Sequence, residues 1–206
     1  YRKKQSPYDS FTDFACYAAF FPQLVAGPIV RADHFRKQIE SPLKTDPYRF
    51  RLGLTLIIYG IAKKLVIADN VALHANAVFI EGDHLMNIGL IWWGALCFGI
   101  QIYCDFSAYT DIAIGSAHLI GVKLPENFDT PYAATSPQDF WRRWHISLSL
   151  WFKDYLYIPL GGSRVGQVRG SFNVLIVFLL TGLWDGASLT FVIWGFLHGI
   201  AIVTER

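Results

Sequence analysis

The stretch Leu85–Cys104, LMNIGLIWWGALCFGIQIYC, contains no charged residue over 20 positions. About 20 consecutive apolar residues are what an α-helix needs to span the hydrocarbon core of a bilayer. The aromatic side chains of Trp92, Trp93 and Tyr103 suit the membrane interface or the packing between helices. This stretch therefore predicts a transmembrane helix, and it decides the fold class.

The composition of the whole chain also indicates an integral membrane protein. Of its 206 residues, 53% are hydrophobic and 17% are charged, compared with about 25% charged in an average soluble domain. The 18 basic and 16 acidic residues nearly cancel to +2, which argues against the clustered basic surface of a nucleic-acid-binding protein. High hydrophobicity excludes intrinsic disorder. We expect membrane lipid, and no nucleic acid, among the partners of the chain.

A second long apolar stretch, Leu52–Ala68, contains the neighbouring residues Lys63 and Lys64. A pair of lysines is costly at the centre of a membrane. We expect this helix to tilt or to enter the membrane only partly. Alternatively, the lysines mark a cytoplasmic edge or a water-filled cavity.

A third apolar region, Phe172–Val203, is interrupted by Asp185 and Gly186. The 13 residues from Phe172 to Trp184 are too few to span a membrane alone. We expect two short helices that meet at a polar break. Irregular backbone at membrane depth is tolerated only where it is buried in protein or lines water, so this break is a candidate site.

Ser136–Gly162 predicts one amphipathic helix, on the membrane surface or inside a bundle. Ser136 is a plausible N-cap, followed by Pro137 at the first helical position. Aromatic residues and His145 recur at helical spacing on one broad face, and Pro159 ends the pattern.

Ionisable residues in these apolar surroundings are candidates for function, because such groups at membrane depth are often functional. His145 and His198 lie among apolar residues, where the alternative is a satisfied core histidine. Asp105 and Asp111 directly follow the uncharged stretch, and the alternative is that Asp105 caps a helix and Asp111 pairs with a lysine or arginine. Motifs of zinc peptidases, nucleotide hydrolases and serine hydrolases are absent, and we expect no metal and no bound cofactor.

Several long blocks resemble the membrane-bound O-acyltransferase (MBOAT) family, in particular the branch of the alginate O-acetylation protein. The blocks are FPQLVAGPIVR (Phe21–Arg31), QIYCDFSAYTDIAIG (Gln101–Gly115), ENFDTPYAATSPQDFWRRWHISLSLWFKDYLYIPLGGSR (Glu126–Arg164) and TGLWDGASLTFVIWGFLHG (Thr181–Gly199). They stand in the family's order and cover almost the whole chain. The D-alanyl transfer protein of teichoic acid modification has similar blocks.

The resemblance implies an all-α fold, a polytopic membrane helical bundle with re-entrant or broken helices around a water-accessible tunnel. It implies a multi-pass protein of the bacterial inner membrane. Residues 1–206 would be part of a single membrane domain whose N- and C-terminal parts are missing, since family chains are longer and the only methionine is Met86.

The implied activity is transfer of an acyl group, here acetyl, to hydroxyls of an exported cell-envelope polysaccharide such as alginate. The cosubstrate would be an acyl donor, acetyl-CoA or an acyl carrier. The partner would be the polysaccharide or a periplasmic or extracellular acetyl-relay protein. The alternative is a non-catalytic membrane scaffold or acyl conduit of the same ancestry. An unrelated transporter is disfavoured by the blocks.

The resemblance also implies the site residues. The family's catalytic histidine lies in a Trp-His-Gly element, and a second important histidine lies in the FWRRWH block, where it matches His145. Asp185 occupies the position of the catalytic histidine. Aspartate, with an ordinary pKa of about 3.9, is a weaker base than histidine at about 6.5. A natural loss of activity, an altered mechanism and an introduced substitution all remain open, and we expect impaired chemistry. The candidates for the substrate or tunnel are His198, Asp105, Asp111, Arg142 and Trp184.

Overall fold

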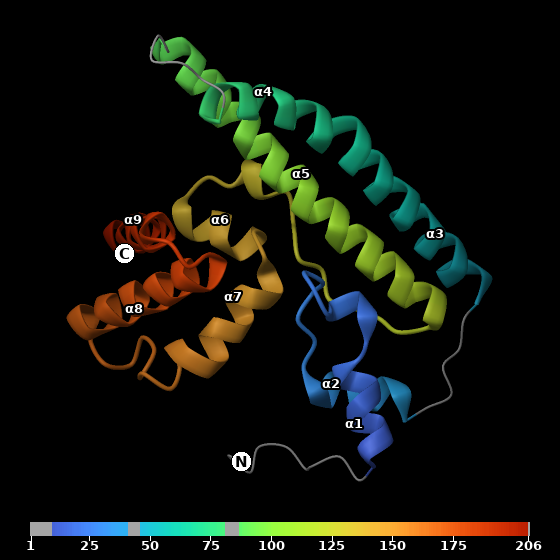
Figure 1. Cartoon of the computed structure of the whole chain (residues 1–206). Helices are drawn as coiled ribbons and strands as arrows, with labels where there is room; N and C mark the ends of the chain where they lie inside the picture. The colour runs from blue at the N-terminus through green and yellow to red at the C-terminus, as the bar shows by residue number, and fades with distance from the viewer. Residues whose placement is uncertain (1–9, 41–45, 81–86, 206) are drawn as a thin grey trace. The chain divides into compact units, whose positions relative to one another are not determined.

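The computed structural model describes residues 10–40, 46–80 and 87–205, and these residues form helices and loops without a strand. The all-α fold class is therefore confirmed. The chain divides into two compact units, Tyr1–Pro125 and Glu126–Arg206. Figure 1 shows the helices of each unit.

The first unit is dominated by two long antiparallel helical runs. One run consists of α3 (Pro47–Ala62), the π-helix η2 (Lys63–Ala68) and α4 (Asp69–Phe79), and the other is α5 (Ile88–Ile120). Figure 1 shows them side by side along their length. Asp46 starts α3 by accepting a hydrogen bond from the backbone N–H of Arg49 at 2.7 Å, which satisfies one of the free donors of the first turn.

Glycines bring the backbones of α3 and α5 into contact. A Cβ atom added at Gly115 would lie 2.6 Å from the carbonyl oxygen of Gly53, and one added at Gly60 would lie 2.7 Å from that of Ala108. Small residues at such contacts are typical of helix pairs in membranes, where close packing replaces the hydrophobic driving force.

The remaining elements of the first unit are short and pack around the C-terminal end of α5. They are α1 (Phe11–Ala18), the 3-10 turn η1 (Phe21–Gln23) and α2 (Ala32–Ile39). The buried apolar cluster that joins them to α5 contains Phe20, Val30, Phe35, Ile114, Ala117, Val122 and Leu124.

The second unit consists of short elements followed by a helical hairpin. In chain order these are η3 (Pro131–Ala133), α6 (Pro137–Arg143), α7 (Ile146–Phe152), the π-helix η4 (Lys153–Tyr157), α8 (Gln167–Asp185) and α9 (Leu189–Thr204). The predicted polar break is confirmed, because α8 ends at Asp185 and α9 begins at Leu189. The expectation that the first of these helices is too short to span is wrong: α8 begins at Gln167 and has 19 residues.

Two further expectations need correction. The single amphipathic helix expected over Ser136–Gly162 is wrong, because the chain breaks between α6 and α7 at His145. The cap at Ser136 is confirmed by its hydroxyl, which accepts a hydrogen bond from the N–H of Asp139 at 3.2 Å. The uncharged stretch does not end its helix at Cys104, since α5 continues to Ile120; Leu85 and Met86 lie outside the described residues.

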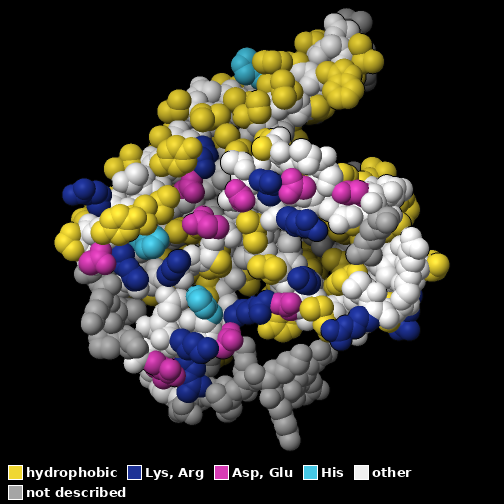
Figure 2. All heavy atoms as spheres, turned by 180° about the vertical axis from the view of Figure 1, so that it is seen from behind, with side chains coloured by type: hydrophobic (Ala, Val, Ile, Leu, Met, Phe, Trp, Pro, Cys, Tyr) yellow, Lys and Arg dark blue, Asp and Glu magenta, His cyan; other side chains and the backbone are white. Residues whose placement is uncertain are grey.

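By length and composition, α5 with 33 residues and α8 with 19 residues are long and apolar enough to cross a membrane. Much of their apolar surface is uncovered: Trp92 on α5 is 72% exposed and Phe172 on α8 is 61% exposed. Figure 2 shows hydrophobic side chains gathered over the described residues of the α4–α5 pair toward the top of the view. Apolar area of this extent indicates contact with lipid or with other protein.

A close backbone crossing also holds α8 against α9. A Cβ atom at Gly182 would collide with the carbonyl oxygen of Phe191, and one at Gly195 would collide with that of Phe178. At Gly199, by contrast, the nearest atom to an added Cβ is a side-chain methyl of Leu175, 3.1 Å away. The crossing therefore requires glycine at Gly182 and Gly195, whereas a leucine side chain leaves some room at Gly199.

We expect Gly182→Ala to lower the free energy of unfolding by about 1–3 kcal/mol, the usual cost of overpacking, because backbone atoms must move. Gly199→Ala is the matched control and should have a smaller effect. The measurement is the thermal unfolding midpoint of the purified full-length protein in detergent. Equal midpoints for the two variants would contradict this account of the crossing.

Candidate functional site

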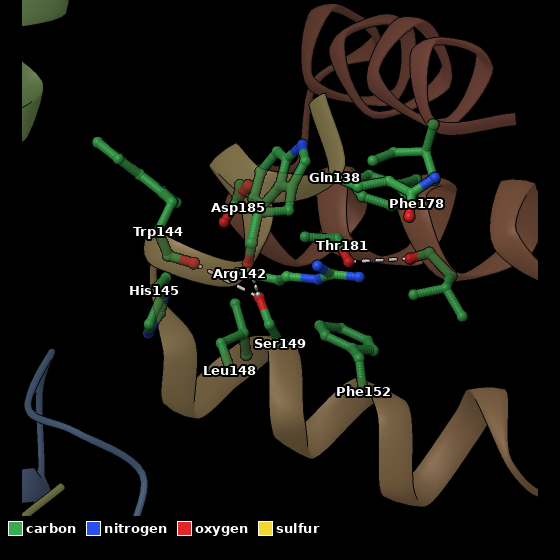
Figure 3. A pocket seen from close by; sticks show the side chains of 13 residues that line it. Gln138, Arg142, Trp144, His145, Leu148, Ser149, Phe152, Phe178, Thr181 and Asp185 are labelled. Atoms are coloured by element: carbon green, nitrogen blue, oxygen red, sulfur yellow. Dashed lines mark hydrogen bonds between the residues drawn. The ribbon is translucent and has the colours of Figure 1, made fainter. Parts of the chain in front are cut away.

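A cavity of about 240 Å³ lies within the second unit. Its walls come from α6, α7, α8 and α9 and from the break between α6 and α7 (Figure 3). Most of the lining is aliphatic or aromatic, and the polar residues that line it are Gln138, Arg142, His145, Ser149, Thr181 and Asp185. A mostly apolar cavity with a few polar groups is the usual form of a small-molecule site.

His145 lies at a sharp break in the backbone between α6 and α7. It has φ of 43° and ψ of 55°, the left-handed conformation that residues other than glycine rarely adopt. Such a conformation costs about 1–3 kcal/mol and persists only where the surroundings enforce it, often at functional sites.

Asn127, which lies 18 residues before His145 in the chain, holds this conformation through hydrogen bonds to the residues that follow His145. Its backbone carbonyl accepts a hydrogen bond from the N–H of Ile146 at 2.9 Å. Its side-chain oxygen accepts two more from Ser147, from the backbone N–H at 3.1 Å and from the hydroxyl at 2.7 Å. Asn127 is fully buried, so these bonds are shielded from water and fix the start of α7.

Arg143 anchors the other side of the break. Its carbonyl accepts a hydrogen bond from the N–H of Asp129 at 3.0 Å. Its guanidinium donates to the carboxylate of Asp139 at 3.0 Å and to the hydroxyl of Thr130 at 3.3 Å. The hydrogen bond from Arg143 lowers the pKa of Asp139. The segment from Asn127 to Thr130 therefore braces the chain on both sides of His145.

The side chain of His145 is buried, with 6% of its surface exposed. Burial lowers its pKa from the ordinary 6.5 to about 4, because removal from water penalises the charged imidazolium. The ring is therefore neutral at pH 7 and retains one nitrogen that can accept a proton or a hydrogen bond. Its ring centroid lies 6.0 Å from that of Trp184.

Asp185 is the last residue of α8 and also lines the cavity. Gly186 follows in an extended conformation, with φ of −175°, and directs the chain away from the helix. A Cβ atom at Gly186 would collide with the ring of Phe191, so glycine lets the chain turn closely past this aromatic side chain. Three of the predicted site residues, His145, Asp185 and Arg142, thus line one cavity.

His198 and Trp184 are not among the residues that line this cavity. His198 packs within an aromatic cluster, with its ring centroid 5.2 Å from Trp141 and 4.6 Å from Trp194. Trp184 is 59% exposed, and its ring lies beside that of His145. His198 thus contacts aromatic side chains and does not line this cavity, and its role stays a prediction.

Asp105 and Asp111 lie in the first unit, where both pair with lysines of η2. Lys63 is buried and contacts Asp111 at 2.6 Å and the hydroxyl of Ser107 at 3.0 Å. Lys64 contacts Asp105 at 2.7 Å and also pairs with an aspartate of α4. The predicted pairing of Asp111 with a lysine is confirmed. The interpretation of Asp105 as an N-cap is wrong, since it lies in the interior of α5.

Two features of the structure were not expected from the sequence: the buried hydrogen bonds of Asn127 and the pairing of Lys64 with Asp105. The only available signal for Asn127 was its position inside the longest family-like block. Within the described ranges, no group of three or more His, Cys, Asp or Glu residues is arranged to hold a metal ion. The cavity offers a neutral imidazole, a carboxylate and a guanidinium, which suit proton transfer and binding of a polar substrate.

Comparison with known proteins gives a match to the membrane-bound O-acyltransferase family over residues 2–206. The chain is 46% identical over 200 residues to a peptidoglycan O-acetyltransferase of Helicobacter pylori, covering 95% of the chain and 37% of the relative. It is 42% identical over 206 residues to a probable alginate O-acetylase of Pseudomonas aeruginosa, covering 100% of the chain and 39% of the relative.

A more distant similarity is 29% identity over 195 residues to a teichoic acid D-alanyltransferase of Bacillus subtilis, covering 89% of the chain and 49% of the relative. The chain thus spans less than two-fifths of the length of the two O-acetylating relatives. These relatives act on different cell-envelope polymers according to their names.

We expect Lys63→Met to lower the free energy of unfolding by about 3–5 kcal/mol, because it leaves the carboxylate of Asp111 without its buried partner. The double variant Lys63→Met/Asp111→Leu should recover most of the loss. Lys64→Met is the control, with a smaller effect, because Lys64 and its partners are about half exposed. Unfolding midpoints of the full-length protein test this, and equal losses for the two single variants would contradict it.

The lowered pKa of His145 predicts a pH dependence of stability. Between pH 6.5 and about 4 the unfolded chain binds a proton at His145 that the folded chain does not. The free energy of unfolding therefore falls as the pH is lowered through this window, by up to about 3 kcal/mol. His145→Gln should remove this part of the loss, whereas His34→Gln, at an exposed position, should retain it. Identical pH profiles for the two variants would refute the assignment.

Proposed function

The chain belongs to the membrane-bound O-acyltransferase family, and we propose that the protein containing it transfers acetyl groups to hydroxyls of an exported polysaccharide such as alginate. The observation that carries the proposal is that His145 and Asp185, the two positions matching the family's important histidines, line the same cavity. Similarity to a peptidoglycan O-acetyltransferase and to alginate O-acetylases supports the acetyl group and the polysaccharide acceptor.

In the proposed reaction, a hydroxyl of the acceptor attacks the carbonyl carbon of an acetyl thioester. A base accepts the proton of the hydroxyl, the new C–O bond forms, and the C–S bond breaks. The thiolate of the donor then takes up the proton. Asp185 is the base, and neutral His145 supplies a hydrogen bond to a reacting group. Because aspartate is ordinarily a weak base, transfer is slower than it would be with histidine at this position.

The donor in this proposal is acetyl-CoA or an acyl carrier, used as a cosubstrate. The acceptor is the polysaccharide itself or a periplasmic or extracellular relay protein that passes the acetyl group on. The protein crosses the bacterial inner membrane several times. The membrane-length helices α5 and α8 and their exposed apolar side chains support this location.

A second candidate function is a non-catalytic membrane scaffold or acyl conduit. The replacement of the expected histidine by Asp185 favours it. The two candidates differ in whether any acetyl group is transferred by the protein with Asp185 as found.

We expect Asp185→His to raise acetyl transfer at pH 7 by about tenfold or more, since a well-matched general base contributes about 10²–10⁴-fold. Asp185→Asn should lower transfer below the starting rate. The measurement is acetylation of exported polysaccharide in cells that carry the full-length protein. Asp13→His, the same exchange at an exposed position of α1, is the control.

Different outcomes separate the two candidates. Transfer that is lost in Asp185→Asn and present with Asp185 identifies the aspartate as the base. Transfer that appears only in Asp185→His identifies a scaffold that has lost its catalytic group. No increase in Asp185→His over the starting protein would contradict the proposed impairment.

A further inference from the structure

Two adjacent arginines at the end of α6 have different surroundings. Arg143 is fully engaged: it bonds to Asp139, to the hydroxyl of Thr130 and to the backbone of Asp129. Arg142 makes no hydrogen bond and no ion pair with any residue in the described part of the chain. Within the described part of the chain, Arg143 therefore has direct polar partners, whereas Arg142 interacts with Asp139 only through longer-range Coulombic attraction.

The side chain of Arg142 extends into the cavity, as Figure 3 shows. Asp185 is the one carboxylate of the cavity lining, and it forms no ion pair with Arg142. The hydroxyl of Thr181 donates its hydrogen bond to the carbonyl of Val177 at 2.9 Å. The lining thus gives the guanidinium no anionic partner, and apolar residues such as Phe152 and Phe178 form much of the adjacent wall.

A guanidinium is permanently charged and has five N–H donors in a planar fork. Arg142 is exposed, so water can hydrate its guanidinium and an anion that enters the cavity can replace that water. The fork matches the two oxygens of a carboxylate or phosphate, which it binds with two parallel hydrogen bonds. Arg142 remains accessible, so a ligand that enters the cavity can reach it.

We propose that Arg142 binds an oxyanion of the substrate and so fixes the substrate's orientation in the cavity beside Asp185. This inference rests on the proposed acyl transfer, because it concerns the same cavity. The oxyanion is a phosphate of the donor, as in coenzyme A or an acyl carrier, or a carboxylate of an acidic sugar in the acceptor. Arg142 is a binding residue in this scheme and takes no part in moving the proton.

The first experiment measures binding, which does not require acetyl transfer. Full-length protein in detergent is titrated with coenzyme A and, separately, with oligomers of an acidic uronic sugar. We expect Arg142→Gln to weaken binding of one of these probes about tenfold or more, and Arg142→Lys to weaken it less, since lysine retains the charge but not the fork. Arg169→Gln, the same exchange at an exposed position of α8, is the matched control and should bind as the starting protein does.

Neutral versions of the probes identify the source of the oxyanion. S-acetyl-N-acetylcysteamine is an acetyl thioester without phosphate, and methyl-esterified sugar oligomers lack the free carboxylate. If Arg142 binds donor phosphate, Arg142→Gln should raise the KM for acetyl-CoA but not for the phosphate-free thioester. If it binds acceptor carboxylate, the variant should discriminate between the free and esterified oligomers instead.

The inference is overturned if Arg142→Gln binds both charged probes as tightly as the Arg169→Gln control, or if the starting protein binds neither. Unfolding midpoints of all variants, measured in parallel, separate lost binding from lost folding. Loss of binding in Arg142→Gln without acetyl transfer by any form would refute the proposed function and leave the oxyanion site standing. Acetyl transfer by the starting protein, together with unaltered binding of both probes in Arg142→Gln, would support the proposed function and refute the oxyanion site.

Discussion

The hydrogen bonds between Ser147 and the side-chain oxygen of Asn127 hold the chain at the point on which the cavity depends. With the matching bond from Ile146 to the carbonyl of Asn127, they stabilise His145 in a left-handed conformation that an unbraced histidine would rarely adopt. A continuous helix through this point would carry His145 on its side instead of at a corner. The corner separates α6 from α7, and both helices contribute residues to the cavity wall.

In both units, a pair of long helices is held together by close backbone contact at glycine residues. Gly53 and Gly115 in one pair, and Gly182 and Gly195 in the other, allow backbones to touch where any side chain would keep them apart. Close packing stabilises each pair without requiring water on its outer surface. Charges inside the first pair are tolerated because Lys63 has both Asp111 and Ser107 as partners. In the second unit, six polar residues instead line a cavity, while Asn127 and Ser147 are buried and bond to each other.

Local patterns predicted the features that depend on local physics. The uncharged stretch predicted the longest apolar helix. Ser136 and Pro137 predicted the start of α6, and Asp185 with Gly186 predicted the break between α8 and α9. The bend at His145 was missed because helical periodicity continues across it, and the bonds to Asn127 that break the helix join residues 19 and 20 positions apart. The partner of Lys63 lies 48 residues away. The site residues came from resemblance, since neither spacing nor composition brings His145 and Asp185 together.

The π-helix at Lys63–Ala68 changes the spacing of the small residues that face α5. On the run that faces α5, buried small residues recur as Gly53, Gly60, Ala68 and Ala75. The intervals are seven, eight and seven residues, and two turns of an α-helix hold about seven residues. The wider turn of the π-helix absorbs the additional residue. The π-helix therefore accommodates one residue more than a regular α-helix would between Gly60 and Ala68, while the small residues on both sides of it still face α5.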